Sequence, residues 1–287
     1  MARRRPIKDT SLKGENIGSI PIGATMLTPY AKKFKDTLGK SVHALNTACV
    51  ALSILPDHIP QQSDLKINIS WSPKEIETSV KISRSYFTKA TIIYVAEGFL
   101  SYLKSIESDK FSPWSKEIFG NDDKPGHAYS FLNRQKCDSI FSVFVFILLI
   151  LRNKIVHGES KKKLSREQIS ILINNKEQIF NTFSGLDVNI LLNNIKLARP
   201  TLKETSSLVR ATIQIVYSID SLYIQSMCIS KKTIQSYIEL PEYKDFFVSI
   251  SKEQCKDKAS SRLSAWLKTH NPPLEQYLKQ FIDIVRN

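Results

Sequence analysis

Arg152, Asn153 and His157 are the residues of this chain whose types and spacing could do chemistry together. In an ideal helix they fall at about 0°, 100° and 140° around the axis, so they share one side. An arginine presents a planar fork of donors that suits a phosphate, and a histidine can act as general base or general acid near neutral pH. An amide beside them can fix the imidazole tautomer or hold a phosphate oxygen. We therefore expect these side chains to bind a phosphate and to move a proton close to it.

The motif closes a helix that is apolar on every side. Residues Ile140–Leu151 are apolar except for one serine, and Arg152 follows directly. This run is too short to span a bilayer and predicts a core helix. Polar groups at the end of such a helix are costly unless they are used or paired. The alternative is an ordinary helix end, with cations at the negative end of the dipole and Gly158 as the cap, but it does not explain Asn153.

The charge of the chain indicates a polyanionic partner. Lys and Arg number 41 against 27 Asp and Glu, which gives a net charge of +14. Such a balance favours nucleic acid over a membrane surface, because no strongly amphipathic basic helix is visible. Basic residues also lie within and just after the motif, where they are candidates to hold an RNA backbone, although a solvated loop is the alternative. These candidates are Lys154, Lys161, Lys162, Lys163 and Arg166.

The cysteines and the first residues of the chain indicate whether the protein binds a metal or a cofactor and where in the cell it is found. The four cysteines are far apart and form no closely spaced ligand pair, so we expect no metal, no cofactor and mostly buried, reduced thiols. The basic start has no apolar stretch behind it, which argues against a secretory signal. The sequence therefore predicts a cytoplasmic protein without a membrane partner.

The fold class predicted from periodicity is all-α, an antiparallel helical bundle with a helical C-terminal extension. We expect a basic arm over 1–28, a bundle over 29–230 and the extension over 231–287. Only 60–71 alternates like a short strand or an extended linker, and 108–134 resembles a projecting loop. Capping-box sequences begin at Ser72, Ser165, Thr201 and Ser251. Helices are expected near 30–55, 74–107, 135–157, 165–184, 187–198, 201–229, 251–269 and 274–286.

The segment Leu151–Gly158 resembles the signature of the HEPN superfamily, in which Arg, a polar residue and three more residues precede His and often Gly. The resemblance implies a small α-helical bundle, and it implies a metal-independent endoribonuclease of the kind found in toxin–antitoxin and phage-defence systems. It also implies a dimer in which two motifs form one cleft. By this resemblance, Arg152 would contact the scissile phosphate, Asn153 would support it, and His157 would carry out the acid–base chemistry.

A second point of resemblance lies upstream, where several HEPN families carry an acidic residue in an aromatic setting. Glu97 interrupts the apolar stretch Ile92–Leu100 and is a candidate to orient Arg152 or His157. The alternative is a salt bridge to a neighbouring Lys or Arg. The resemblance covers about residues 74–185 and is specific at these two points.

One histidine per chain supplies only half of the proton transfers that RNA cleavage needs, so the chemistry itself predicts a homodimer. The sequence thus favours an endoribonuclease that cuts RNA by 2′-OH attack at a dimer cleft. Its biological role would be that of a toxin or an antiviral, abortive-infection effector, with an antitoxin or another regulatory partner protein. Two alternatives stay open: a non-catalytic helical module that binds RNA or a nucleotide, and an interaction or antitoxin-type protein.

Overall fold

The computed structural model describes residues 26–57, 75–119, 123–158 and 160–286. These residues form twelve α-helices and one 3₁₀ helix, with no strand among them, which confirms the all-α class. The expected strand or linker over 60–71 and nearly all of the expected arm lie outside the described residues. The helices are α1 Pro29–Ile54, α2 Ile76–Ser108, α3 Lys124–Arg134, α4 Ser139–His157, α5 Arg166–Asn174, α6 Lys176–Thr182, α7 Val188–Leu197, α8 Leu202–Ser226, α9 Lys231–Ile238, α10 Pro241–Ser251, α11 Lys256–His270 and α12 Leu278–Arg286, with the 3₁₀ helix at Pro272–Tyr277.

Helix α4 lies at the centre of the bundle. Every residue of Ser142–Leu151 is buried, and α2, α3, α5 and α8 pack around the helix. A helix without a polar face must be surrounded in this way. By length and composition its 19 residues could cross a membrane, although 61% of the apolar window is buried inside the fold. One buried helix of this kind does not indicate a membrane protein.

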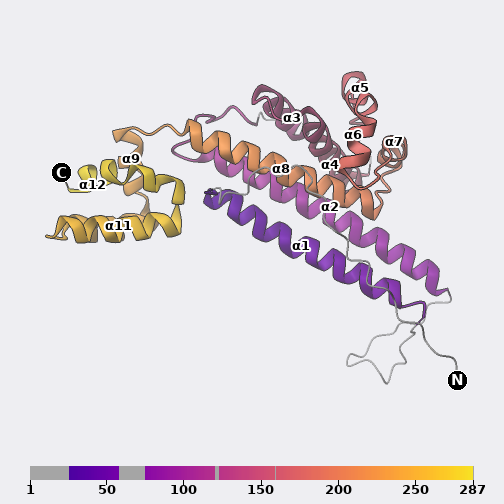
Figure 1. The fold of residues 1–287 in the computed structure, drawn as a ribbon, viewed down its shortest axis with the longest axis horizontal. Coiled ribbons are helices and arrows are strands. Elements are labelled where there is room, and N and C mark those ends of the chain that lie inside the picture. Colours follow the sequence, from indigo (N-terminus) through magenta and orange to yellow (C-terminus); the bar gives the residue numbers. More distant parts are fainter. Residues whose placement is uncertain (1–25, 58–74, 120–122, 159, 287) are drawn as a thin grey trace.

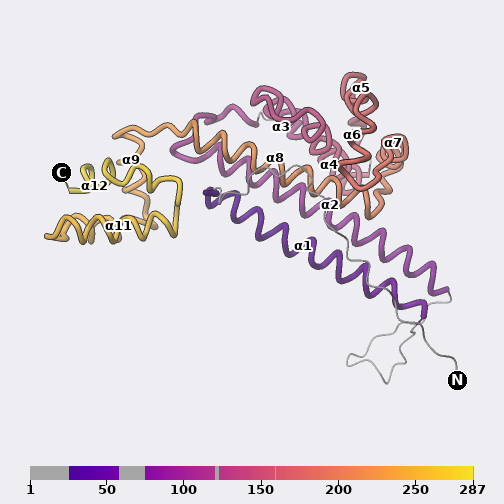
Figure 2. The backbone as a smooth tube through the Cα atoms, viewed as in Figure 1, coloured from indigo at the N-terminus to yellow at the C-terminus, as the bar shows by residue number. Residues whose placement is uncertain are grey.

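The long helices α1, α2 and α8 lie side by side (Figure 1). Contacts between Phe34 and Tyr102 at one end, and between Leu52 and Arg84 at the other, show that α1 and α2 are antiparallel. Helix α8 runs parallel to α2, because the chain returns through α3–α7 before α8 begins (Figure 2). The start of α8 therefore lies near the start of α2 and the end of α1.

A buried carboxylate joins the other ends of these three helices. Asp220 on α8 is 1% exposed and accepts hydrogen bonds from the backbone N–H and the hydroxyl of Thr28, the N-cap of α1. It also accepts a 3.3 Å bond from the Tyr102 hydroxyl on α2. Burial raises the pKa of Asp220, while the bonds from Thr28 and Tyr102 oppose that shift.

The C-terminal helices α9–α12 pack on one another beside the bundle (Figure 1). An aromatic cluster surrounds Tyr237, and the Tyr237 ring lies 5.2 Å from Phe111, just after α2. The Cys228 N–H donates to the Phe111 carbonyl at 2.9 Å. Both the backbone and the rings thus hold this group of helices against the end of α2.

Three expectations about elements were wrong. The segment 108–134 is not only a loop, because α3 occupies its last third and buries Ala128, Phe131 and Leu132 at helical spacing. Pro125 and Gly126 favour a loop when read alone, yet a proline is well tolerated in the first turn of a helix. The range 165–184 divides into α5 and α6, and α9 and α10 were missed.

The prediction of a capping box at Ser251 was also wrong, because that serine ends α10 and α11 begins at Lys256. By contrast, Ser165 and Thr201 form complete capping boxes, as predicted. The cysteines were expected to be mostly buried. Cys228 and Cys255 are exposed, and Cys49 and Cys137 are half-buried.

Replacing Asp220 with alanine is expected to lower the free energy of unfolding by about 3 kcal/mol, because the buried backbone N–H and hydroxyl of Thr28 would lose their acceptor. The variant Asp220→Asn keeps an acceptor oxygen and should lose less. Denaturant unfolding at neutral pH measures both losses. Equal stability of the parent and Asp220→Ala would contradict this role.

The same residue gives a pH dependence with a defined sign. The folded pKa of Asp220 lies above its ordinary value of 3.8, so the folded protein holds this proton more tightly than the unfolded chain. The stability of the parent relative to Asp220→Asn should therefore fall as pH rises from about 3.8 through the folded pKa. A relative stability that rises across this window would contradict the account.

Candidate functional site

The last turn of α4 is joined to α2 through an arginine–carboxylate pair. Arg152 donates from Nε to Glu97 Oε1 at 2.6 Å, and its Nη2 lies 2.5 Å from the same oxygen. The side chains are 24% and 49% exposed, respectively. A pair this exposed contributes little to stability, so its consequence is to fix the plane of the guanidinium. Glu97 is thus the salt-bridge partner of Arg152. This contact agrees with both roles considered for Glu97, which are to orient Arg152 and to form a salt bridge.

The remaining guanidinium nitrogen joins the other two motif residues. Arg152 Nη1 donates to Asn153 Oδ1 at 2.9 Å and lies 3.2 Å from His157 Nε2. A guanidinium has donors only, so Nε2 must accept in this contact. His157 is then a neutral imidazole with its proton on Nδ1. All four predicted site residues meet at one guanidinium.

Local sequence explains why these groups meet. Glu97 lies on the exposed side of α2, whose neighbouring residues Ala96 and Phe99 are fully buried. Gly158 has φ +66° and ends α4 directly after His157, with its N–H donating to the Lys154 carbonyl. The imidazole therefore lies at the negative end of the helix dipole.

A cleft of about 550 Å³ opens in front of the motif. Besides Glu97, helix α2 contributes Ser101 and Lys104, which follow at helical spacing, and the start of α3 contributes Lys124. Sequence reasoning missed these residues. The spacing of Ser101 and Lys104 from Glu97 could have indicated them, whereas the approach of α3 depends on tertiary packing.

The carboxylates that line this cleft are all engaged within the fold. Glu107 accepts from the backbone N–H groups of Ile118 and Phe119, and Asp123 caps α3 and pairs with Lys162. Lys104 and Lys124 have no ion pair among the residues that the structure describes. An anion entering the cleft therefore meets two free lysines in addition to the motif.

The five predicted RNA-binding residues differ in what they contact. Lys154 donates to the Ile195 carbonyl at 3.0 Å, and burial together with Lys163 lowers its pKa. Lys162 pairs with Asp123. These two cations are engaged within the fold. Lys161, Lys163 and Arg166 are exposed and without ion pairs in the described ranges, so they remain open to an external anion.

Metal-ligating side chains do not cluster in the part of the chain that the structure describes. No group of three or more His, Cys, Asp or Glu residues there could hold a metal ion. The expected absence of a metal and of a cofactor stays a prediction.

The contact with Arg152 predicts the tautomer of His157. We expect ¹⁵N spectra of the neutral ring to show the Nδ1–H form in the parent, because Nε2 accepts from the guanidinium. In Arg152→Ala that donor is gone, and a mixture of the two tautomers is expected. A parent ring protonated on Nε2 while neutral would contradict the geometry.

The comparisons with known proteins identify no relative. No protein-family model, curated protein or solved structure matches the chain. The function of the site therefore has to follow from its own contacts and charge.

Proposed function

We propose that the protein is a metal-independent endoribonuclease with its active site at the end of α4. The observation that carries the proposal is the shared guanidinium of Arg152, which contacts Glu97, Asn153 and the acceptor nitrogen of a neutral His157. A general base beside a cation suited to phosphate is what cleavage of RNA by its own 2′-OH requires. The resemblance of Leu151–Gly158 to the HEPN signature supports the same chemistry.

The contacts suggest an order of events. Nε2 has a single lone pair, so Arg152 Nη1 first moves from Nε2 to the substrate phosphate. His157 Nε2 then takes the proton of the 2′-OH, and the 2′-oxygen forms a bond to phosphorus while the bond to the 5′-oxygen breaks. The leaving 5′-oxygen takes a proton from a general acid, and the products carry a 2′,3′-cyclic phosphate and a 5′-OH. Once protonated, both ring nitrogens of His157 are donors, so the ring can no longer accept from Arg152. Nη1 therefore stays on the phosphate as negative charge builds on it, while Glu97 still holds Nε and Nη2.

The surrounding charge suits an RNA substrate. Lys104 and Lys124 line the cleft, and Lys161, Lys163 and Arg166 lie exposed after the motif. Cations in these positions can contact phosphates on either side of the one that is cut. The net charge of +14 adds a long-range attraction.

A homodimer would complete the acid–base pair, since a second copy could supply the general acid from its own motif. Helix α2 presents exposed apolar side chains along its length: Ile82, Tyr86 and Tyr94 are 65%, 69% and 63% exposed, and Tyr94 lies one turn before Glu97. Val156, next to the catalytic histidine, is 45% exposed. We assign this apolar surface to the dimer contact. A toxin or antiviral effector acting in the cytoplasm, restrained by an antitoxin or another regulatory protein, is the biological role that the resemblance favours.

The second candidate is a non-catalytic module that binds RNA or a nucleotide. One observation favours it: His157 is the one histidine among the described residues that line the cleft, whereas cleavage needs a general acid as well as a general base. Salt-sensitive RNA binding without cleavage products would identify this function.

The variant His157→Ala is expected to lose cleavage by at least about a hundredfold, because it removes the general base. The assay measures the initial rate on total RNA and tRNA in the presence of EDTA. The matched control is His43→Ala, which removes an exposed histidine of α1 and should leave the rate unchanged.

Two outcomes would contradict this assignment. Equal cleavage by the parent and His157→Ala would place the activity elsewhere. Sedimentation should give a mass twice the chain mass of 32.7 kDa, and a strictly monomeric chain that cleaves RNA would contradict the shared cleft.

A further inference from the structure

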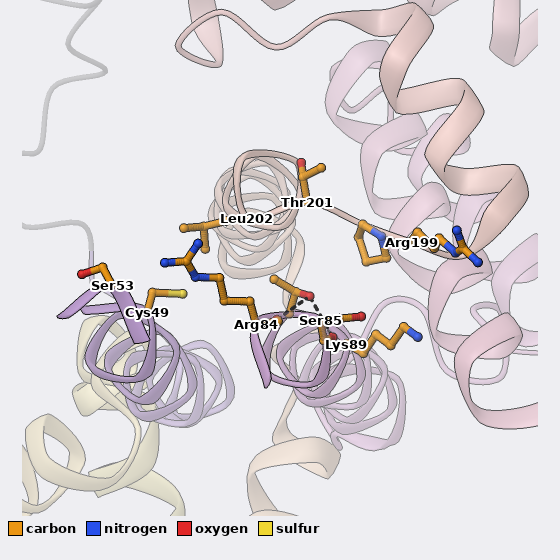
Figure 3. A pocket seen from close by; sticks show the side chains of 10 residues that line it. Cys49, Ser53, Arg84, Ser85, Lys89, Arg199, Thr201 and Leu202 are labelled. Carbon is orange, nitrogen blue, oxygen red and sulfur yellow. Dashed lines mark hydrogen bonds between the residues drawn. The ribbon is translucent and has the colours of Figure 1, made fainter. Parts of the chain in front are cut away.

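A second concave site lies at the opposite side of α2 from the motif cleft. It has a volume of about 600 Å³ and forms where the end of α1, the first half of α2 and the start of α8 come together (Figure 3). It shares no lining residue with the cleft at Arg152. Its lining residues are Cys49, Ser53, Arg84, Ser85, Thr88, Lys89, Arg199, Pro200, Thr201 and Leu202.

The charge of this pocket is entirely positive. Arg84, Lys89 and Arg199 line it, and no acidic residue does. None of these three cations has an ion pair among the residues described. The nearby carboxylate of Glu204, three residues after the N-cap Thr201, is buried and accepts from Asn194 Nδ2 and from the Thr201 N–H, both at 2.7 Å. It is therefore occupied within the fold.

The three cations are placed differently. Arg84 extends from α2 into the space between α1 and Leu202, whereas Lys89 lies on the other side and Arg199 points outward (Figure 3). The Arg84 guanidinium makes a single long contact, from Nη2 to the Leu52 carbonyl at 3.5 Å. Most of its donors are therefore open. Arg84 is the group best placed to hold an anion here, whereas the Lys89 amine points away from the Arg84 guanidinium (Figure 3).

The walls of the pocket are partly apolar. Leu202, the first residue of α8, is 42% exposed and lies beside the Arg84 side chain (Figure 3). Pro200 and Cys49 add apolar surface. An open guanidinium beside an exposed apolar wall suits a ligand that is anionic at one end and apolar at the other.

We propose that this pocket binds a free nucleotide, with its phosphate on Arg84 and its base against Leu202. The volume falls within the range of about 300–1,000 Å³ that is usual for small-ligand sites. The planar guanidinium provides bidentate recognition of a phosphate. A nucleotide combines a charged group with a flat ring, as the pocket combines open cations with an apolar wall. This site is independent of RNA cleavage at Arg152.

Isothermal titration calorimetry of the full chain in EDTA tests the proposal, with AMP, ATP and inorganic phosphate as separate probes. Saturable 1:1 binding of a nucleotide, tighter than that of phosphate, is expected. The variant Arg84→Glu should weaken it by at least about tenfold. The matched control Lys231→Glu makes the same charge change at an exposed position of α9 and should bind like the parent. The double variant Arg152→Ala/His157→Ala should also bind like the parent.

Several results would overturn the proposal. These are the absence of saturable binding by either nucleotide, equal binding by Arg84→Glu and the parent, and loss of binding in Arg152→Ala/His157→Ala. A single-stranded RNA that displaces the nucleotide with an affinity rising with its length would instead mark the surface as part of an RNA track. Circular dichroism checks the fold of each variant, and Arg84→Gln replaces Arg84→Glu if the latter is unfolded.

Discussion

The burial of α4 on all sides is the constraint on which the rest of this structure depends. An all-round apolar helix can be stable in water only when other helices cover it, and α2, α3, α5 and α8 do so. Polar side chains can then leave the helix only at its ends. The polar chemistry of α4 is therefore concentrated in its last turn, from Arg152 to His157, where α2 presents Glu97. The same packing that stabilises the core also assembles the candidate active site.

The contacts of the Arg152 guanidinium hold the side chain in place, and one of them, to His157, depends on the protonation of the imidazole. Three nitrogens of Arg152 are engaged, so the side chain is held in one position before any ligand arrives. Its ion pair with Glu97 is partly solvated and contributes at most about 1 kcal/mol to stability. The contact with His157 lasts only while the ring is neutral. Movement of Nη1 from the ring to a bound phosphate would thus free the base and bring a donor to the place where charge develops.

The sequence predicted the parts of the fold that depend on local rules. The apolar run before Arg152, the capping boxes at Ser165 and Thr201, and the spacing of the motif required no tertiary information. Helix α3 was missed because Pro125 and Gly126 usually interrupt helices, and only burial of its apolar face reveals it. The C-terminal helices were partly missed because α9 and α10 are short and joined by tight turns.

The sequence predicted which residues form the motif, but it did not predict which other side chains surround them. The sequence indicated that Glu97 could contact Arg152, because an acidic residue in an apolar stretch needs a partner. The engagement of Lys154 with the Ile195 carbonyl could not be predicted, because the two residues lie on different helices, α4 and α7, and meet only in the tertiary structure. Lys124 reaches the cleft for the same kind of reason. Long-range packing decides which cations remain free for a ligand.

The most direct test of the central claim is to compare an RNA oligonucleotide with the same oligonucleotide carrying a 2′-deoxy sugar at the cleaved position. Mass spectrometry of the products identifies their ends. The account predicts a 2′,3′-cyclic phosphate and a 5′-OH from the first substrate, and no cleavage at that position in the second. Cleavage of the deoxy substrate there, or products with a 5′-phosphate and a 3′-OH, would contradict it.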